Sequence, residues 1–441
     1  MDGSKTQGSV EIDALLDAHP IGATQIYVLV LATLAVIFDG YDLQSLAITV
    51  TSLAKAWRIE PAALSVASSA SLLGMGLGAA LLGPLGDRLG RRTVLAATMG
   101  IVGLSSLATA LAQDPGQLAV CRFFTGAALG ASLANAFVLT ADFMPRRRRA
   151  TLVTLSYCNT ATGALIAGLI APAAMARFGW PATFVIGGAL PLALSVLLLA
   201  TGPESIKFLL QRRPGSPATA TLLRRLAPEV APERVYLQPP AQPLKGSVVE
   251  LLGRRFRVST LMLWLGFGMN SFNLYLLVSW LPTLLAGAGW LPAQAGRALA
   301  FNQLGGILGG VSLGRLMDRF GAERTLAVGF GINVLAMLLF LIVPPGFLSW
   351  GVLLLVVGAC TGGAQFAIVS LAATLYPPDI LATGSGWASA VARIGAFASA
   401  LVGGALIHAG VAPAHLIAGL AIPAVFGIIS MLALSRAQHP R

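Results

Sequence analysis

Apolar stretches of about twenty residues recur along the whole of this 441-residue chain, and they limit what it can fold into. One helix of about 20 apolar residues spans the hydrocarbon core of a bilayer. Within that core, only helices and closed barrels satisfy all of their backbone hydrogen bonds. Charged residues make up 10% of the chain, against about 25% in a soluble domain. The sequence therefore predicts an all-α membrane protein with twelve transmembrane helices, at 24–53, 62–85, 93–113, 117–141, 150–175, 181–202, 258–286, 294–316, 325–344, 347–375, 382–408 and 412–435.

Basic residues are distributed unevenly between the two sides that twelve spans define. With the amino terminus inside, 23 of the 29 Lys and Arg residues fall in cytoplasmic segments, which predicts that both termini are cytoplasmic. The net charge of +12 is then explained by attraction to anionic lipid and not to nucleic acid. The first 24 residues lack the basic region that begins a cleaved signal peptide, so the first helix is expected to remain as an anchor.

The chain repeats itself with an offset of about 231 residues. Residues 83–92 correspond to 314–324, and the offset aligns Asp87 with Asp318. Six helices separate equivalent positions, so both halves keep the same orientation, and a substrate site is expected at their interface. The expected organisation is a cytoplasmic segment 1–23, a six-helix domain 24–202, a cytoplasmic linker 203–257, a six-helix domain 258–435 and a cytoplasmic tail 436–441.

Two carboxylates lie three residues apart in the first apolar stretch, at Asp39 and Asp42. That spacing puts them on one helical face. Carboxylates inside a membrane are costly and mark proton, ion or substrate sites. The repeat places Asn270 and Asn273 at the equivalent positions, which suggests proton handling in the first half and hydrogen bonding to substrate in the second. Common descent without function is the alternative interpretation.

Two arginines lie inside predicted spans, several residues away from the span ends. Arg122 is near the outer end of the fourth span, at a depth similar to that of Asp39 and Asp42, so a reversible ion pair is expected. Protonating the acid would weaken the pair and favour one access state; a static pair is the alternative. Arg393 lies in the middle of the eleventh span, with no acid at neighbouring helical positions. Its planar fork suits a substrate carboxylate, whereas the alternative is a packing role against helix carbonyls.

Carboxylates also follow helix ends on the predicted cytoplasmic side. There Asp87 and Asp318 can face the amino terminus of an adjacent helix and favour one closed arrangement, which predicts a gate. Asp142 either joins this cluster beside Arg91 or Arg92, or relays protons. The gate candidates are Asp87, Arg88, Arg91, Arg92, Asp318 and Arg319.

Patterns typical of enzymes are not found in this sequence. Cys121, Cys158 and Cys360 are scattered singly in apolar stretches, which indicates neither a metal site nor a disulfide framework. The glycines at 74–78 lie in an apolar span with no preceding strand, so they favour close helix packing over nucleotide binding. No nucleophile constellation or phosphate loop is recognisable either. We therefore expect no enzymatic activity, no cofactor and no metal.

Several motifs together indicate a family. One set comprises residues 83–92, their weaker copy at 314–324, and Arg122 ahead of Gly126 and Gly130. A second set comprises residues 39–43, 178–180, 203–205, 376–377, 383–387 and 393–395. On these residues the chain resembles, along nearly its whole length, the aromatic acid:proton symporters of the major facilitator superfamily. The resemblance implies two six-helix halves in a bacterial inner membrane, alternating access, and a role of Asp39 and Asp42 in symport.

Departures from the family pattern leave the substrate open more than the fold. Asp142 stands where Glu is usual, Leu381 where Arg is usual, and Asn159 and Ala400 where Gly and Pro are expected. Asn159 could project a polar group toward the cavity, and aromatic side chains could stack on a ring. The substrate-binding candidates are Arg393, Asn270, Asn273, Tyr41, Trp387 and Asn159; the proton-coupling candidates are Asp39, Asp42, Arg122 and Asp142.

The sequence thus predicts a transporter that imports a small aromatic carboxylate of the hydroxybenzoate type together with protons. It is expected to work as a monomer, with lipid and without nucleic acid as a partner. One alternative is a proton antiporter that expels amphipathic compounds, which the direction of flux would distinguish. Another is a non-transporting receptor for aromatic acids, although the linker at 203–257 is too rich in proline to resemble an output domain.

Overall fold

The computed structural model is almost entirely helical. It describes residues 10–212, 215–231, 234–237, 248–376 and 378–438. Eleven helices in these ranges are long and apolar enough to cross a membrane. A further helix, α13 (Pro292–Phe320), has 29 residues and is equally long, but Arg297 near its start and Arg315 and Arg319 near its end lower its mean hydropathy. The described residues therefore contain twelve membrane-length segments, which confirms the predicted all-α fold.

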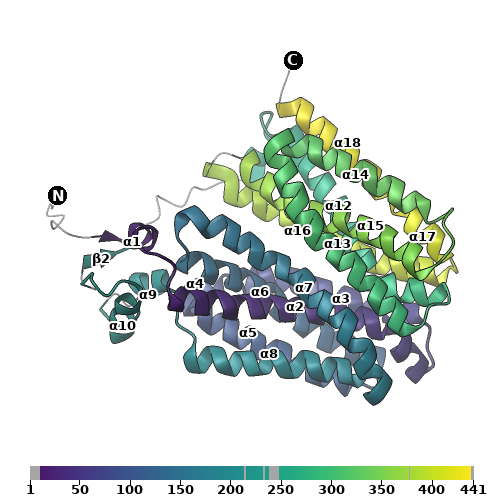
Figure 1. The fold of residues 1–441 in the computed structure, drawn as a ribbon, viewed down its shortest axis with the longest axis horizontal. Helices are drawn as coiled ribbons and strands as arrows, with labels where there is room; N and C mark the ends of the chain where they lie inside the picture. The colour runs from purple at the N-terminus through teal and green to yellow at the C-terminus, as the bar shows by residue number, and fades with distance from the viewer. Residues whose placement is uncertain (1–9, 213–214, 232–233, 238–247, 377, 439–441) are drawn as a thin grey trace.

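These segments form two bundles, which Figure 1 shows side by side. The first bundle contains α2 (Ala23–Trp57), α3 (Ser65–Leu81) preceded by the short helix η1 (Pro61–Leu64), α5 (Arg91–Ala110), α6 (Pro115–Phe143), α7 (Arg146–Phe178) and α8 (Pro181–Thr201). The second contains α12 (Arg257–Gly287), α13, α14 (Ala322–Leu339), α15 (Phe347–Leu375), α16 (Pro378–His408), and a last segment divided into α17 (Pro413–Gly419) and α18 (Ala421–Gln438). Every predicted span coincides with one of these segments.

One difference from the predicted boundaries has a clear cause, at the start of α7. The sequence suggested a start at residue 150, but the helix begins at Arg146, directly after Pro145. Because Pro145 has an extended backbone and cannot continue α6, a new helix starts at once and takes the arginine run into its first turn.

The repeated glycines bring helices together backbone to backbone. A Cβ at Gly78 or Gly126 would overlap backbone atoms of the facing helix in the pair α3 and α6. The same is true of Gly309 and Gly358 in the equivalent pair, α13 and α15. Small residues allow this close approach inside membranes. The packing interpretation of the glycines at 74–78 is therefore confirmed.

Short elements gather at one end of the bundles, here called the linker end; the opposite end is the far end. The strand β1 (Val10–Glu11) pairs in parallel with β2 (Val235–Tyr236), with Val10 opposite Val235. Ile12 and Leu16 of α1 (Ile12–Ala18) are buried in the core of the first half, together with Leu223 of the linker. The remaining short helices are α4 (Leu85–Leu89), α9 (Ile206–Arg212), α10 (Pro217–Leu226) and α11 (Val248–Leu251).

One acidic side chain ties this assembly to the first bundle. Asp13 of α1 pairs with Arg149 at 2.7 Å, with Lys207 at 2.9 Å and with Arg146 at 3.2 Å. Burial alone would raise the pKa of Asp13, but hydrogen bonds and positive charge from Lys207 and Arg149 lower it from 3.8 to about 2. The amino-terminal segment and the start of the linker are therefore held on the first half.

The hydrophobic cores show where the two halves meet. At the far end, a single core contains residues of both halves, among them Leu53 of α2 and Trp280 of α12. Toward the linker end, one core belongs to the first half with its docked segments, and another belongs to the second half. Figure 1 shows the two bundles leaning apart toward the chain ends. The halves are therefore closed at the far end and separated toward the linker end.

Candidate functional site

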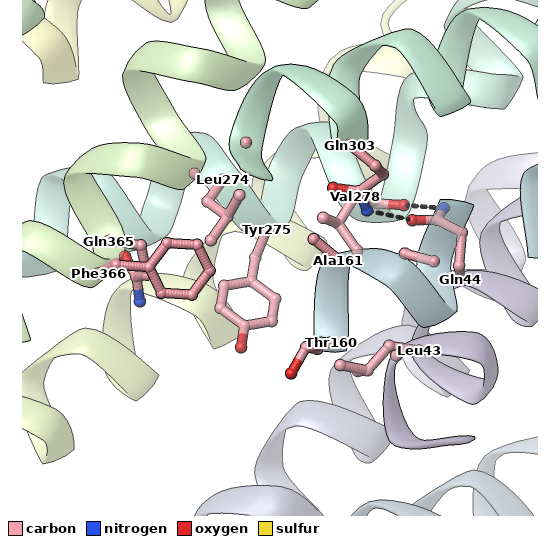
Figure 2. Close-up of a pocket in the computed structure, with 14 residues that line it drawn as sticks. Leu43, Gln44, Thr160, Ala161, Leu274, Tyr275, Val278, Gln303, Gln365 and Phe366 are labelled. Carbon is pink, nitrogen blue, oxygen red and sulfur yellow. Dashed lines mark hydrogen bonds between the residues drawn. The ribbon is translucent and has the colours of Figure 1, made fainter. Parts of the chain in front are cut away.

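A central cavity lies between the two halves and encloses about 600 Å³, part of it open to solvent. Residues of five helices line this space, and Figure 2 shows them around it. Its lining consists of Gly40, Leu43 and Gln44 from α2, Thr160, Ala161 and Ala164 from α7, Leu274, Tyr275 and Val278 from α12, Gln303 and Gly306 from α13, and Gly362, Gln365 and Phe366 from α15.

The polar groups in the central cavity are neutral, and three of them are glutamines. Gln44 Nε2 donates to the Val278 carbonyl at 2.9 Å. Gln303 Nε2 donates to Gln44 Oε1 at 3.3 Å. Gln44 thus connects α2 of one half with α12 and α13 of the other (Figure 2). Sequence reasoning missed Gln44, Gln303 and Gln365, although a polar amide within an apolar span was the available signal.

A second cavity of about 360 Å³ adjoins the first, and Leu43, Tyr275 and Val278 line both. Its wall also contains the two charged side chains Asp42 and Arg122. Ser68, Ser71 and Leu72 of α3 complete one side of it. The charges of the first half therefore lie directly beside the central cavity.

Asp42 and Arg122 form the ion pair that the sequence predicted, with both side chains 1% exposed. Arg122 Nη1 lies 2.9 Å from Asp42 Oδ2 and 3.1 Å from Oδ1. Ser106 Oγ donates to Asp42 Oδ1 at 2.7 Å. Arg122 Nη2 donates to the hydroxyls of Thr109 and Thr125, each at 3.0 Å. These contacts stabilise an ionised pair, although Arg122 Nε has no hydrogen-bond partner among the described residues. Removing either partner would leave an uncompensated buried charge.

Asp39 lies one helical turn before Asp42 and has a different environment. Its side chain is fully buried, and neither carboxyl oxygen has a hydrogen-bond partner in the described part of the chain. The charge of Arg393, from the other half, acts on Asp39 and on Tyr275. The predicted pairing with Arg122 thus occurs at Asp42 and not at Asp39.

Arg393 extends from α16 toward the first half, since a Cβ at Gly76 of α3 would lie 3.5 Å from Arg393 Cδ. The arginine is half-buried. Within the described ranges, its guanidinium forms no ion pair and no hydrogen bond. A positive charge near mid-membrane with no paired anion can bind an anionic group.

None of the substrate candidates, Arg393 included, is among the residues that line the two cavities. Asn270 Nδ2 donates to Gln365 Oε1 at 2.8 Å, so it contacts the cavity wall indirectly. Asn273 Nδ2 donates to the Leu420 carbonyl at 3.1 Å, and the Tyr41 hydroxyl donates to the Thr183 carbonyl at 3.3 Å. Both point away from the cavity, because Gly40, Leu43 and Gln44 occupy the cavity face of α2 and Leu274, Tyr275 and Val278 that of α12.

Two further substrate candidates also have partners elsewhere. Asn159 Nδ2 donates to the Leu155 carbonyl of its own helix at 2.8 Å. Trp387 stacks on Trp264 with ring centroids 6.0 Å apart, and it is 44% exposed. Their roles in binding remain predictions. Ala400 accepts a hydrogen bond from Trp280 through its carbonyl, and the side chain of Leu381 lies outside the described residues.

The gate candidates of the first half lie at the linker end. Arg91 forms an ion pair with Asp87. Arg92 Nε donates to the Leu198 carbonyl at 2.9 Å, which ties α5 to α8. Glu204, missed as a site residue, accepts from the Arg92 backbone N–H at 3.0 Å and thereby caps α5. These contacts hold helices of one half together.

The remaining candidates at this end differ in their surroundings. Asp142 Oδ2 accepts from Ser205 Oγ at 2.6 Å, so its hydrogen bond goes to the start of the linker and not to Arg91 or Arg92. Arg88 is exposed. Arg319 lies over the Phe320 ring at 5.3 Å, whereas the side chain of Asp318 lies outside the described residues.

Comparison with known proteins gives consistent results. The family model described as Major Facilitator Superfamily matches residues 32–400 and 263–441. The chain is 35% identical over 435 residues to the gallate transporter of Pseudomonas putida, covering 97% of this chain and 96% of that protein. It is 34% identical to the 4-hydroxybenzoate transporter PcaK of Pseudomonas aeruginosa, covering 98% and 97%. It is 27% identical to the benzoate transport protein of Acinetobacter baylyi, covering 97% and 93%.

Solved structures share the fold. A bacterial homolog of the human lysosomal transporter Spinster, in an inward-facing and unoccupied conformation, superposes with a TM-score of 0.66. The two proteins are 18% identical, and the match covers 95% of this chain and 96% of the other.

Proposed function

Because the chain belongs to the aromatic acid transporters of the major facilitator superfamily, we propose that it imports a small aromatic carboxylate together with protons across a bacterial inner membrane. Gallate, 4-hydroxybenzoate and benzoate, which the relatives are named for, are the first compounds to consider. The observation that carries the proposal is a central cavity between two similar halves, with the buried carboxylates Asp39 and Asp42 beside it and, on the second half, Arg393, whose charge acts on the lining residue Tyr275.

The arrangement of the two halves supports alternating access. Their shared core closes the far end, and their cores are separate toward the linker end. With cytoplasmic termini, as the basic residues predict, the cavity opens to the cytoplasm. In the opposite state the linker end would close, with the ion pair of Asp87 and Arg91, together with Arg88, Arg92, Asp318 and Arg319, in the closing surfaces.

Substrate binding requires one charged contact and several neutral ones. Arg393 binds the carboxylate through its planar fork, beside Tyr275, on which its charge acts. The ring lies between the aromatic side chains of the cavity, Tyr275 and Phe366. Ring hydroxyls bind to the amides of Gln365 and Gln303, and Asn270 positions Gln365 by donating to its Oε1.

Proton coupling involves Asp39, Asp42, Arg122 and Asp142. Buried carboxylates beside a substrate site can couple a proton to substrate binding, because the two occupancies then stabilise the same access state. Asp39 and Asp42 are within one helical turn of each other, and Gly40 and Leu43 of that turn line the central cavity. Asp142 is at the linker end, where a proton would leave toward the cytoplasm.

Uptake by purified protein in liposomes tests this function. Labelled gallate, 4-hydroxybenzoate and benzoate are supplied outside, with and without an inward-directed proton gradient and with a protonophore as control. We expect one of these acids to accumulate above its external concentration only when the gradient is present. Accumulation of none, with drug-like cations moving against the proton flux, would instead identify an antiporter.

A further inference from the structure

The two intramembrane carboxylates are not equivalent, although they lie on one face of one helix. Asp42 accepts hydrogen bonds from Arg122 and Ser106, so its charge is compensated. Asp39 has no donor on either oxygen in the described part of the chain, at 0% exposure. Burying an ionised carboxylate without a partner costs several kcal/mol, whereas the protonated form carries no net charge. The geometry in this access state therefore favours Asp39 with a proton and Asp42 without one.

The groups around Asp39 are few. On its own helix the nearest charge is Asp42, and on α16 it is Arg393; the titratable side chain on α12 is Tyr275. The facing helix α7 has no charged residue between Arg149 and Arg177, and α3 has none at all. Arg122 already has Asp42 as its partner. If Asp39 loses its proton, Arg393 is the cation available to it.

The same arginine is the proposed ligand of the substrate carboxylate. We propose that Asp39 is the proton-carrying carboxyl and that, once ionised, it competes with the substrate carboxylate for Arg393, while Asp42 stays paired with Arg122. This inference rests on the proposed function, because it specifies how that site couples the two species. It concerns a contact between the two halves, since Asp39 lies on α2 and Arg393 on α16.

The proton step needs no further reactant. The O–H bond of the Asp39 carboxyl breaks, the proton passes to water in the cavity beside Gly40, and the carboxylate pairs with Arg393. The substrate carboxylate loses its arginine and is released to the same side. On binding, the substrate takes Arg393, and Asp39 takes up a proton from water. Because each species then binds more tightly when the other is bound, proton and substrate move together.

Exchange and accumulation measured side by side test the assignment. Liposomes with the wild type or with Asp39→Asn are given labelled 4-hydroxybenzoate, first in counterflow without a gradient and then with an inward gradient of one pH unit. One proton per cycle supports about tenfold accumulation across one pH unit. The amide of the Asp39→Asn variant cannot release a proton, so we expect counterflow to persist without pH dependence while the accumulation ratio falls to about 1.

Two variants provide the comparison. Asp42→Asn is expected to lose both accumulation and counterflow, because Arg122 would be left unpaired. Glu229→Gln changes an exposed carboxylate at the linker end and should behave as the wild type. Accumulation by Asp39→Asn, or an Asp42→Asn protein that exchanges without accumulating, would overturn the assignment. The two possible failures give different results. If the proposed function is wrong, the wild type accumulates none of the three acids. If only the assignment of Asp39 is wrong, the wild type accumulates an acid and the variants depart from the pattern above.

A spectroscopic measurement keeps the inference testable if Asp39→Asn does not fold. Infrared difference spectra of wild-type protein are recorded on addition of 4-hydroxybenzoate at a pH where binding takes up a proton. We expect a carboxylic C=O band to appear, and we expect Asp39→Glu to shift its frequency. A band that appears at the same frequency in Asp39→Glu would assign the proton to another group.

Discussion

Replacing Asp42 with Asn should destabilise the first half strongly, because the change leaves the Arg122 guanidinium charged at 1% exposure without its anion. Breaking a buried ion pair from one side typically costs about 3–5 kcal/mol. Arg122 keeps the hydroxyls of Thr109 and Thr125 and the ring of Phe184 at 5.2 Å. These remaining contacts place the expected cost near the lower limit, at about 3 kcal/mol.

The measurement is a double-mutant cycle with Asp42→Asn, Arg122→Gln and both together. For a unit of about 150–250 residues, each kcal/mol lowers the unfolding temperature by roughly 2–4 °C, so Asp42→Asn should lower it by about 6–12 °C. The double variant should be more stable than the sum of the single costs predicts, because it removes both charges. Ser106→Ala, which removes one neutral donor to Asp42, is the matched control and should cost about 1 kcal/mol.

Two results would show that the ion pair does not stabilise the first half. An unfolding temperature of Asp42→Asn within about 2 °C of the wild type, a cost of less than about 1 kcal/mol, would show that Arg122 finds another partner. Strictly additive costs in the cycle would show that the two side chains do not stabilise each other.

Other predictions concern separate parts of the molecule. Gly163→Val should prevent folding, since its side chain would overlap the Ile37 carbonyl between α7 and α2, and the yield of monodisperse protein measures this. Arg393→Lys should weaken the binding of 4-hydroxybenzoate by tenfold or more, about 1.4 kcal/mol, because lysine cannot form a bidentate contact with a carboxylate. Near-normal affinity in a binding titration would instead indicate that Arg393 has a packing role. The stabilisation from the Asp13 ion pairs should be fully present above the ordinary carboxyl pKa of 3.8 and lost as the pH falls toward 2, because the pKa of Asp13 is lower in the folded protein. At neutral pH, Asp13→Asn should therefore make the amino-terminal segment easier to cleave with protease. An unchanged cleavage rate would contradict this. Gln44→Leu removes a hydrogen-bonded link between the halves and should change the exchange rate of 4-hydroxybenzoate with little loss of stability.

The sequence was sufficient for the fold because apolar spans and the internal repeat leave few alternatives. It also located Asp42 and Arg122, since charges inside a membrane are expensive and stand out. It could not decide which acid takes Arg122. Asp39 and Asp42 share a helical face, and the choice depends on where Ser106 and the rest of α5 lie relative to α2.

The residues that line the central cavity were harder to predict from the sequence. Which face of α2 meets the other half follows from the packing of two bundles, and that packing selects Gln44 over Tyr41. Burying the amide of a glutamine in a membrane span costs less free energy than burying a charge, so a glutamine stands out less in the sequence. The pairing of Val10 with Val235 joins two-residue strands far apart in the chain, which are too short for a recognisable alternating pattern.

Simultaneous measurement of proton and substrate flux shows whether the two species cross the membrane together. Wild-type protein in liposomes loaded with a pH-sensitive dye receives 4-hydroxybenzoate outside, at equal pH and with the membrane potential clamped to zero. We expect the lumen to acidify as the acid enters, in a fixed ratio of protons to substrate, and we expect Asp39→Asn to abolish the acidification but not exchange. Substrate entry without acidification, or with protons leaving, would contradict coupled import.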